Sequence, residues 1–246
     1  MSRNILGFFS GPTDEDYKEP TKTYVMSDEG DRVDLAPDAA TFDAQKIRVV
    51  FFPLERELLT WLEGFDAVVG CVAWLTNTRL LSSLNKKSYC QVIMQKEDWL
   101  RPDGTTSHPG VNLNTRECYR RRAGFDRSEL QDLAGLSYLS DPMLERYRVF
   151  GINGARTQNP VMHHKFLVGC DATERNEAGQ LVFKPKSVWA GSFNMTGRSV
   201  RNLDSAIIMG SEPASVYYKE WRDAVMFSEP LDFNANYVCP EWRLGT

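Results

Sequence analysis

The sequence predicts an α/β protein, in which helices flank a sheet. Short β-branched and apolar runs alternate with amphipathic stretches of helical length from residue 46 to residue 95, and further apolar runs follow from residue 145. The 246 residues suffice for a sizeable core, and the 42% hydrophobic and 25% charged content is ordinary for a globular domain. No apolar run reaches the length of a membrane span, so none is expected.

The first half of this pattern predicts parallel strands. KIRVVFF (46–52) reads as a buried strand, and the Leu-rich stretch 54–65 as a helix. A second buried strand over 66–75, a helix over 76–87 and a third strand over 88–95 follow. Strand, helix, strand, helix, strand at this spacing predicts a parallel sheet with right-handed crossovers.

The second half predicts a hairpin and a closing helix. Strands are expected over 145–152, 162–170 and 181–191, with the turn ERNEAG joining the last two, and another strand over 205–210. A helix over 215–227 then covers the core. Its expected core residues are Val216, Trp221, Val225 and Met226.

The chain divides by composition into a leader over 1–45 and a domain over 46–246. The leader has ten acidic and four basic residues, a balance of −6, which leaves +2 for the domain in a chain of net charge −4. It is either loosely ordered or docks on the domain through a strand in TKTYVM. The polar stretch 100–114 reads as a long loop. Five scattered cysteines without CxxC spacing favour a reducing compartment, so a cytoplasmic location is expected.

A histidine and a lysine that share one face of a strand carry the chemistry. In MHHKF, side chains alternate, so His163 and Lys165 point to one face and His164 to the other. A neutral histidine attacks an electrophile or carries a proton, and the lysine adds a positive charge. GSFN follows and brings the amide donor of Asn194. Together these groups suit a phosphoryl group, and the chemistry requires no metal or cofactor.

MHHKF followed by GSFN resembles the His-Lys-Asp motif of the phospholipase D superfamily, whose pattern is His-x-Lys, four residues, Asp, and a later Gly-Ser-x-Asn. His163 and Lys165 match its first two positions, and Gly191, Ser192 and Asn194 match the turn. The segment NMTGRSVRNLDSAII and the strand VVGCVAWL are also similar. The resemblance implies an α-β-α sandwich with a mixed, largely parallel central sheet and one motif per chain.

One position departs from the family pattern. Cys170 stands where the family has aspartate, and Asp171 comes one place later. Either a bulge brings Asp171 into position, or Asp171 only makes a turn and the aspartate's place is vacant. The long gap from Asp171 to Gly191 is assigned to the hairpin.

The resemblance also implies roles for the other residues. Asp204, in NLDSAII, has the place of an acidic residue that orients the histidine, with a surface charge as the alternative. Ser192 either caps the helix that begins in NMTGRS or hydrogen-bonds the phosphate. The expected catalytic residues are His163, Lys165, Asn194, Ser192, Asp171 and Asp204.

The number of motifs implies a homodimer. In the family, one histidine attacks phosphorus to form a phosphohistidine, and a second protonates the leaving oxygen. This chain has three histidines, and His108 in SHPG has no following lysine. Two chains that share one active site on a two-fold axis supply both histidines.

An arginine cluster and three tryptophans suggest a nucleic-acid substrate. The cluster is either a solvated helix face or a patch that binds phosphate groups. Its four arginines and Gly191 are the expected substrate-binding residues. The arginines are Arg116, Arg120, Arg121 and Arg122. Trp74, Trp99 and Trp189 either stack on bases or belong to the core.

Three functions follow from these features. The leading hypothesis is a metal-independent, homodimeric endonuclease that cleaves DNA or RNA. The resemblance extends it to a defence or restriction system with a partner protein. A hydrolase of phospholipids or other phosphodiesters shares the same chemistry. A binding module with weak or no catalysis is the third hypothesis, and the displaced Asp171 motivates it.

Overall fold

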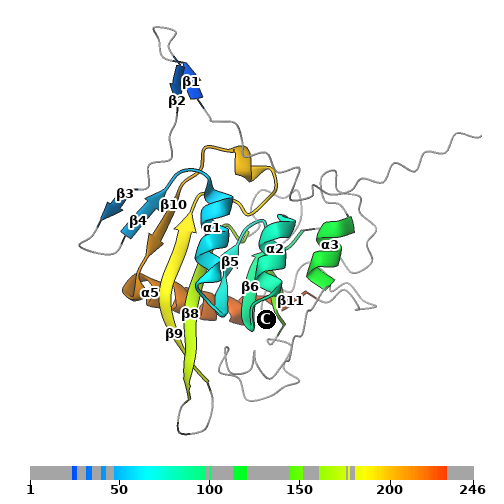
Figure 1. Ribbon diagram of the computed structural model, residues 1–246. Helices are drawn as coiled ribbons and strands as arrows, with labels where there is room; N and C mark the ends of the chain where they lie inside the picture. The colour runs from blue at the N-terminus through cyan, green and yellow to red at the C-terminus, as the bar shows by residue number, and fades with distance from the viewer. Residues whose placement is uncertain are drawn as a thin grey trace, which may run out of the picture. The chain divides into compact units, whose positions relative to one another are not determined.

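The computed structural model describes residues 47–97, 100, 113–120, 145–151, 161–175, 177 and 181–231, together with the backbone of three short strands before them (Figure 1). The chain divides into two compact units, Met1–Pro37 and Asp38–Thr246. In the first, β1 (Tyr24–Met26) pairs with β2 (Arg32–Asp34) as an antiparallel hairpin. The second carries the main sheet and includes β3 (Ala40–Phe42), which pairs with β4 (Ile47–Val50). The leader boundary expected at residue 45 stays a prediction.

The described strands of the second unit form one mixed sheet in the order β11-β7-β6-β5-β8-β9-β10-β4-β3. Its centre contains β5 (Ala67–Val72) and β6 (Tyr89–Gln95), and β7 (Tyr147–Phe150) and β11 (Glu229–Pro230) follow β6 toward one edge. On the other side of β5 lie β8 (Lys165–Arg175), β9 (Leu181–Gly191) and β10 (Ala206–Met209).

The expected α/β class and mixed sheet are confirmed, but the largely parallel pairing is wrong. Only the β5–β6 and β6–β7 pairs of this sheet are parallel among the strands that are described. The 46–52 strand, expected beside the 66–75 strand, instead pairs with β10 and β3, both antiparallel. The β8–β9 pair, itself antiparallel, occupies the position next to β5, and β8 runs antiparallel to β5.

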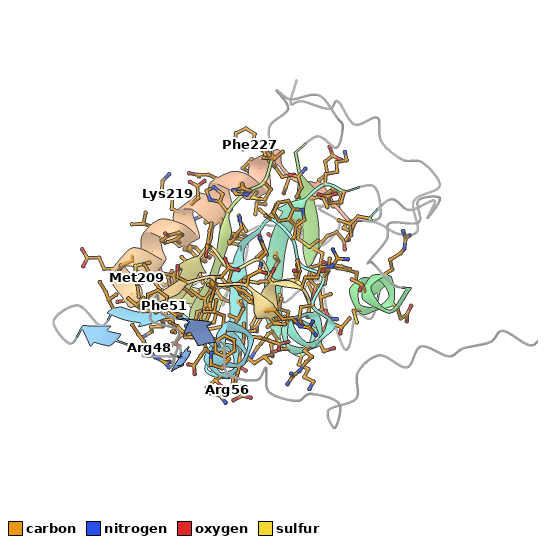
Figure 2. All side chains as sticks on the ribbon, turned by 90° about the horizontal axis from the view of Figure 1, so that it is seen from above. Arg48, Phe51, Arg56, Met209, Lys219 and Phe227 are labelled. Carbon is orange, nitrogen blue, oxygen red and sulfur yellow. The ribbon has the colours of Figure 1, made fainter. Side chains whose placement is uncertain are left out.

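Helices cover both faces of the sheet. One face carries α1 (Leu54–Glu63), α2 (Thr78–Asn85) and α3 (Leu113–Arg120), and the other carries α5 (Ser211–Phe227), as Figure 2 shows in a view along the layers. The first core cluster includes Leu58, Leu62 and Trp189. The second includes Phe166 and Trp221 and lies under α5. The alternation of side chains along each strand therefore supplies two separate cores.

The buried face of α5 differs from the expectation. Trp221 and Val225 are buried as expected, and Ala214 joins them, whereas Val216 and Met226 are exposed. Residues 214, 221 and 225 lie seven and four positions apart and share one face, because each helical residue turns about 100°. Val216 and Met226 fall off this stripe.

The strand directions place the motif residues along one edge of the sheet, the edge that is formed by the ends of its strands. β5, β6 and β9 end there, whereas β8 and β10 begin there, because β8 pairs antiparallel with β5 and β9, and β10 pairs antiparallel with β9. MHHKF leads into β8, and GSFN leaves β9. The two fragments therefore meet although they are far apart in sequence. In the parts of the chain that the structure describes, no helix combines the length and apolar character needed to cross a membrane.

Candidate active site

His163 and Lys165 point to the same side at the start of β8. Lys165 Nζ lies 3.3 Å from His163 Nε2 and donates a hydrogen bond to the His163 carbonyl oxygen at 3.0 Å. The His163 ring is exposed and lies beside a cation.

His164 points to the opposite side, toward α5. Its Nε2 lies 3.4 Å from Glu220 Oε1, and its ring packs against Phe166 at a centroid distance of 5.6 Å. This placement agrees with the strand alternation and separates His164 from Lys165.

Both motif fragments are anchored on the residues that follow β5. Ala73 N donates to the His164 carbonyl oxygen at 2.7 Å, which holds the first fragment. Leu75 bridges Met195 in parallel fashion, and Asn77 N donates to the Met195 carbonyl oxygen at 3.0 Å. A short stretch of chain thus holds the turn of Asn194 and the segment of His163 at the same edge.

Ser192 links the start of β10 to this turn. Its hydroxyl donates to Asp204 Oδ1 at 2.7 Å and accepts from Ser205 N at 3.0 Å. It therefore does not cap the short helix that follows. That helix, η4 (Ser199–Arg201), begins after Arg198 and has no side-chain cap, and Thr196 Oγ1 accepts from Ser199 N in the turn before it. The Ser192 bonds hold Asp204 in position.

Gly191 is explained by the closeness of β10. A Cβ at this position would lie 2.1 Å from the Ser205 carbonyl oxygen and 2.7 Å from the Ala206 Cα. Only glycine lets the two strands approach this closely, and the approach brings Ser205 within reach of Ser192. Gly191 thus shapes the site through its backbone.

Lys165 has an unusual electrostatic environment. Partial burial lowers the pKa of its ammonium group from the usual 10.5, and the nearby negative charge of Asp204 opposes this effect. Two oxygens of the turn, Asn194 Oδ1 and Asp204 Oδ2, are buried and have no hydrogen-bond partner within the described residues. Buried polar atoms without partners are uncommon in folded proteins and suit a site that a ligand completes.

The structure does not bring Asp171 to His163. Asp171 lies six residues beyond Lys165 on β8, roughly 20 Å along the strand, and its carboxylate pairs with Lys186 Nζ at 3.0 Å. Between Gly169 and Cys170, the pairing of β8 with β9 shifts by one residue and passes over Lys186 of β9. The extra residue is thus on β9, and the side chains of β8 keep their alternation. Cys170 is buried in the core under α5. Of the two alternatives for the family aspartate, this geometry favours the vacant place.

The arginine cluster is described only in part. Arg116 lies on α3, and for Arg120 the structure describes the backbone alone, whereas Arg121 and Arg122 lie outside the described residues. The hydroxyl of Tyr119 donates to the Leu75 carbonyl oxygen and is 3.1 Å from Met94 Sδ. This contact fixes α3 beside the stretch that anchors the motif fragments.

Trp74, one of the three tryptophans considered for base stacking, lies at the site and not in the core, and Glu97 is a neighbouring residue that the sequence did not single out. The Trp74 ring lies edge-on to that of His163, with centroids 5.8 Å apart, and the Lys165 ammonium is 5.7 Å from the Trp74 centroid. Trp74 Nε1 donates to Glu97 Oε1 at 3.0 Å. The available signal is the parallel β5–β6 pair, because the residues after two such strands meet at one edge. Trp189 is buried in the core, and Trp99 lies outside the described residues.

The buried carboxylate of Glu55 supports the turn of Asn194 indirectly, through Asn77. Glu55 is 4% exposed, and its Oε1 accepts from Asn77 Nδ2 at 2.8 Å. Asn77 Oδ1 accepts from Arg79 N and Leu80 N, so Asn77 is the N-cap of α2. Because Asn77 N also bonds the Met195 carbonyl, the cap and the turn share one residue.

The described side chains include no group of three or more His, Cys, Asp or Glu that is arranged to hold a metal ion.

Comparisons with known proteins give weak likenesses. No protein-family model matches the chain. The chain is 28% identical over 214 residues to the uncharacterized protein L381 of Acanthamoeba polyphaga mimivirus, an alignment that covers 81% of this chain and 69% of that protein. NucT from Helicobacter pylori is a similar solved structure, with a TM-score of 0.47 and 12% identity over 75% of this chain and 98% of NucT.

Two further solved structures are similar at a lower level. Nuc from Salmonella typhimurium, a phospholipase D family member, has a TM-score of 0.43 and 11% identity over 74% of this chain and 95% of Nuc. Phosphatidylserine synthase from Haemophilus influenzae Rd KW20 has a TM-score of 0.41 and 11% identity over 85% and 45% of the two chains. At such low scores, a functional proposal for this chain has to rest on its own side chains.

Proposed function

We propose that this chain is a phosphodiesterase that uses His163 as its nucleophile and acts on nucleic acid. The observation that carries the proposal is the 3.3 Å contact between His163 Nε2 and Lys165 Nζ on an exposed strand end. It pairs a nitrogen lone pair with a cation that can hold a phosphate oxygen. The placement of Asn194 and Asp204 at the same edge supports it.

The chemistry proceeds in two displacements. His163 Nε2 attacks phosphorus, a P–N bond forms, and the ester P–O bond breaks as the leaving oxygen takes a proton from a second histidine. That histidine then removes a proton from water, whose oxygen attacks phosphorus and breaks the P–N bond. Lys165 stabilises the negative charge on the phosphoryl oxygens in both steps, and Asn194 adds an amide donor. A metal ion has no required step in this scheme.

The second histidine comes from a second copy of the chain. Sharing one site across a two-fold axis supplies two copies of His163, Lys165 and Asn194. Two exposed apolar residues beside the motif support this arrangement: Val161 is 56% exposed and Leu203 is 77% exposed. Exposed apolar groups beside the motif suit the buried core of an isologous interface.

The nucleic-acid substrate rests on the arginines of the α3 region. Tyr119 ties α3 to Leu75, next to Trp74, and Arg116 lies one helical turn away on the same helix. The sequence continues with Arg120, Arg121 and Arg122, and residues 46–246 carry a net charge of +2. An arginine on a helix tied to the site, and an arginine-rich sequence after it, suit a polymer of phosphates. The defence role and the partner protein remain predictions of the family resemblance.

The decisive experiment compares His163→Ala with His164→Ala. Each variant is incubated in chelator with single- and double-stranded DNA and RNA and, separately, with phospholipid vesicles. We expect His163→Ala to lose cleavage by about a thousandfold or more, because the nucleophile is gone. His164→Ala is expected to stay within about threefold of the unsubstituted protein, since this exposed side chain points away from His163, toward Glu220 of α5.

Three outcomes decide the assignment. Cleavage of nucleic acid that survives His163→Ala contradicts the proposed nucleophile. Release of a lipid headgroup without action on DNA or RNA keeps the nucleophile and replaces the substrate. Retention of nucleic acid with no turnover, equal in unsubstituted protein and His163→Ala, favours a binding module instead.

A further inference from the structure

Trp74 is an exposed tryptophan at the active site. It is 36% exposed, whereas Trp189 and Trp221 are each at most 1% exposed. Trp61 packs against Phe65 and Trp189 and donates its indole N–H to Ser187. Among the tryptophans that the structure describes, Trp74 is therefore the one placed to meet a ligand.

The Trp74 ring is held in one orientation. Its indole N–H donates to Glu97 Oε1 at 3.0 Å, and Glu97 itself is half-buried at the end of β6. On either side, Ala73 N bonds the His164 carbonyl and Leu75 bridges Met195. A ring fixed before binding loses little conformational freedom when a ligand arrives.

The Trp74 ring lies close to both residues that are proposed to act on the phosphate. Its centroid is 5.8 Å from that of His163 and 5.7 Å from Lys165 Nζ. A phosphodiester held by His163 and Lys165 carries a nucleoside on each side, so one of the flanking bases comes within reach of the indole. The carboxylate of Glu97 repels a second phosphate from the indole edge, which favours a neutral base at this position.

On the basis of the proposed function, we propose that Trp74 is a stacking subsite for an unpaired nucleobase next to the scissile phosphate. Aromatic side chains stack on bases with little sequence preference, because every base has a flat face. A base inside a duplex is already covered on both faces and must first leave its stack. The subsite therefore selects single-stranded nucleic acid over duplex.

The test measures binding in the non-cleaving His163→Ala protein. Fluorescence anisotropy compares a labelled single strand, the same strand with every base removed, and its duplex. In this background, the intact strand is expected to bind about tenfold more tightly than the abasic strand, the usual scale for one stacked base. Adding Trp74→Ala should bring that ratio close to one, whereas Trp74→Phe should retain most of it. Phe227→Ala, which removes a more exposed aromatic side chain on α5 (Figure 2), is the control and should keep the full ratio.

The outcomes separate this inference from the function on which it rests. Loss of the base-dependent ratio in Trp74→Ala, with Trp74→Phe retaining it, supports the subsite. An unchanged ratio in Trp74→Ala, with tight binding of the intact strand, overturns the subsite and leaves the nuclease proposal standing. Failure of every strand to bind the His163→Ala protein overturns the nucleic-acid substrate and the subsite together.

Discussion

At the scale of single residues, the role proposed for Lys165 opposes its contribution to stability. The side chain begins a strand whose next residues are buried, and partial burial lowers the pKa of its ammonium group. Asp204 offsets part of this effect. A cation held in such a place is unfavourable for folding but ready to bind a phosphate oxygen.

Lys165→Met is expected to separate these two effects. Catalysis should fall by about a hundredfold or more, because a charge that stabilises the transition state is removed. Stability at neutral pH should be equal or higher, because methionine fills a similar volume without a charge. The activity is measured as kcat in chelator and the stability as the thermal midpoint.

The pH dependence of stability provides a second readout. Between the lowered pKa of Lys165 and 10.5, the unfolded chain binds more protons than the folded chain, so this group adds stability as the pH rises through that window. The advantage of Lys165→Met should therefore shrink at alkaline pH. Lys219→Met, which removes an exposed lysine on α5, controls for the loss of a charge. A lower midpoint for Lys165→Met at neutral pH would contradict this account.

At the scale of elements, the contact between β9 and β10 shapes the turn that carries Asn194. Gly191 pairs with Ala206, and Ser192 N donates to the Ser205 carbonyl oxygen at 2.9 Å. The hydroxyl of Ser192 then bonds both Ser205 N and Asp204. The close approach of β9 and β10 thus determines where the Asp204 carboxylate lies.

Gly191→Ala should disturb this contact. Its Cβ would lie 2.1 Å from a backbone oxygen, and backbone yields less readily than a side chain. We expect unfolding free energy to fall by about 1–3 kcal/mol and activity to fall as Asp204 and Asn194 shift. Chemical denaturation checks the first effect. Gly197→Ala is the matched control, because a Cβ there meets nothing within 4 Å, and it should leave stability nearly unchanged. Equal stability of the two variants would refute the packing argument.

At the scale of the whole molecule, the proposed site is incomplete in one chain. A single His163–Lys165 pair supplies a nucleophile but not the acid that protonates the leaving oxygen. Asp171, the other candidate from the motif, pairs with Lys186 on the hairpin instead. In the proposed mechanism, symmetric association of two chains supplies the missing acid.

Leu203→Glu should weaken that association. Leu203 is 77% exposed next to Asp204, and a buried charge at a two-fold interface meets its own copy. We expect a shift from dimer to monomer by light scattering, together with loss of activity. Val216→Glu, at a similarly exposed position on α5, should remain dimeric. A monomeric unsubstituted protein with full activity would exclude the shared site.

Mixed dimers give an independent check of the same proposal. Unsubstituted and His163→Ala chains are mixed in equal amounts and allowed to exchange partners. If every site needs two copies of His163, roughly a quarter of the dimers are complete. The mixture should then have roughly a quarter of the activity of the same total amount of unsubstituted protein. Retention of half would mean that each chain acts alone.

The sequence by itself determined the features that depend on local periodicity. The helices over 54–63 and 78–85 and the strands over 67–72 and 89–95 lie within the predicted ranges, because apolar spacing reports burial directly. Strand alternation was sufficient to place His163 and Lys165 on one side and His164 on the other.

Only the tertiary structure decided which strands pair and what each polar group meets. The strand at 47–50 pairs with β10 rather than with β5, because long-range pairing depends on competition among strands and not on local pattern. Asp171 pairs with Lys186, and Trp74 with Glu97, across distances in sequence that no motif spacing encodes. The chemistry proposed for His163 and Lys165 rests on five residues of sequence. The groups that surround these two residues come from separate strands, and only the tertiary structure brings them to the same edge of the sheet.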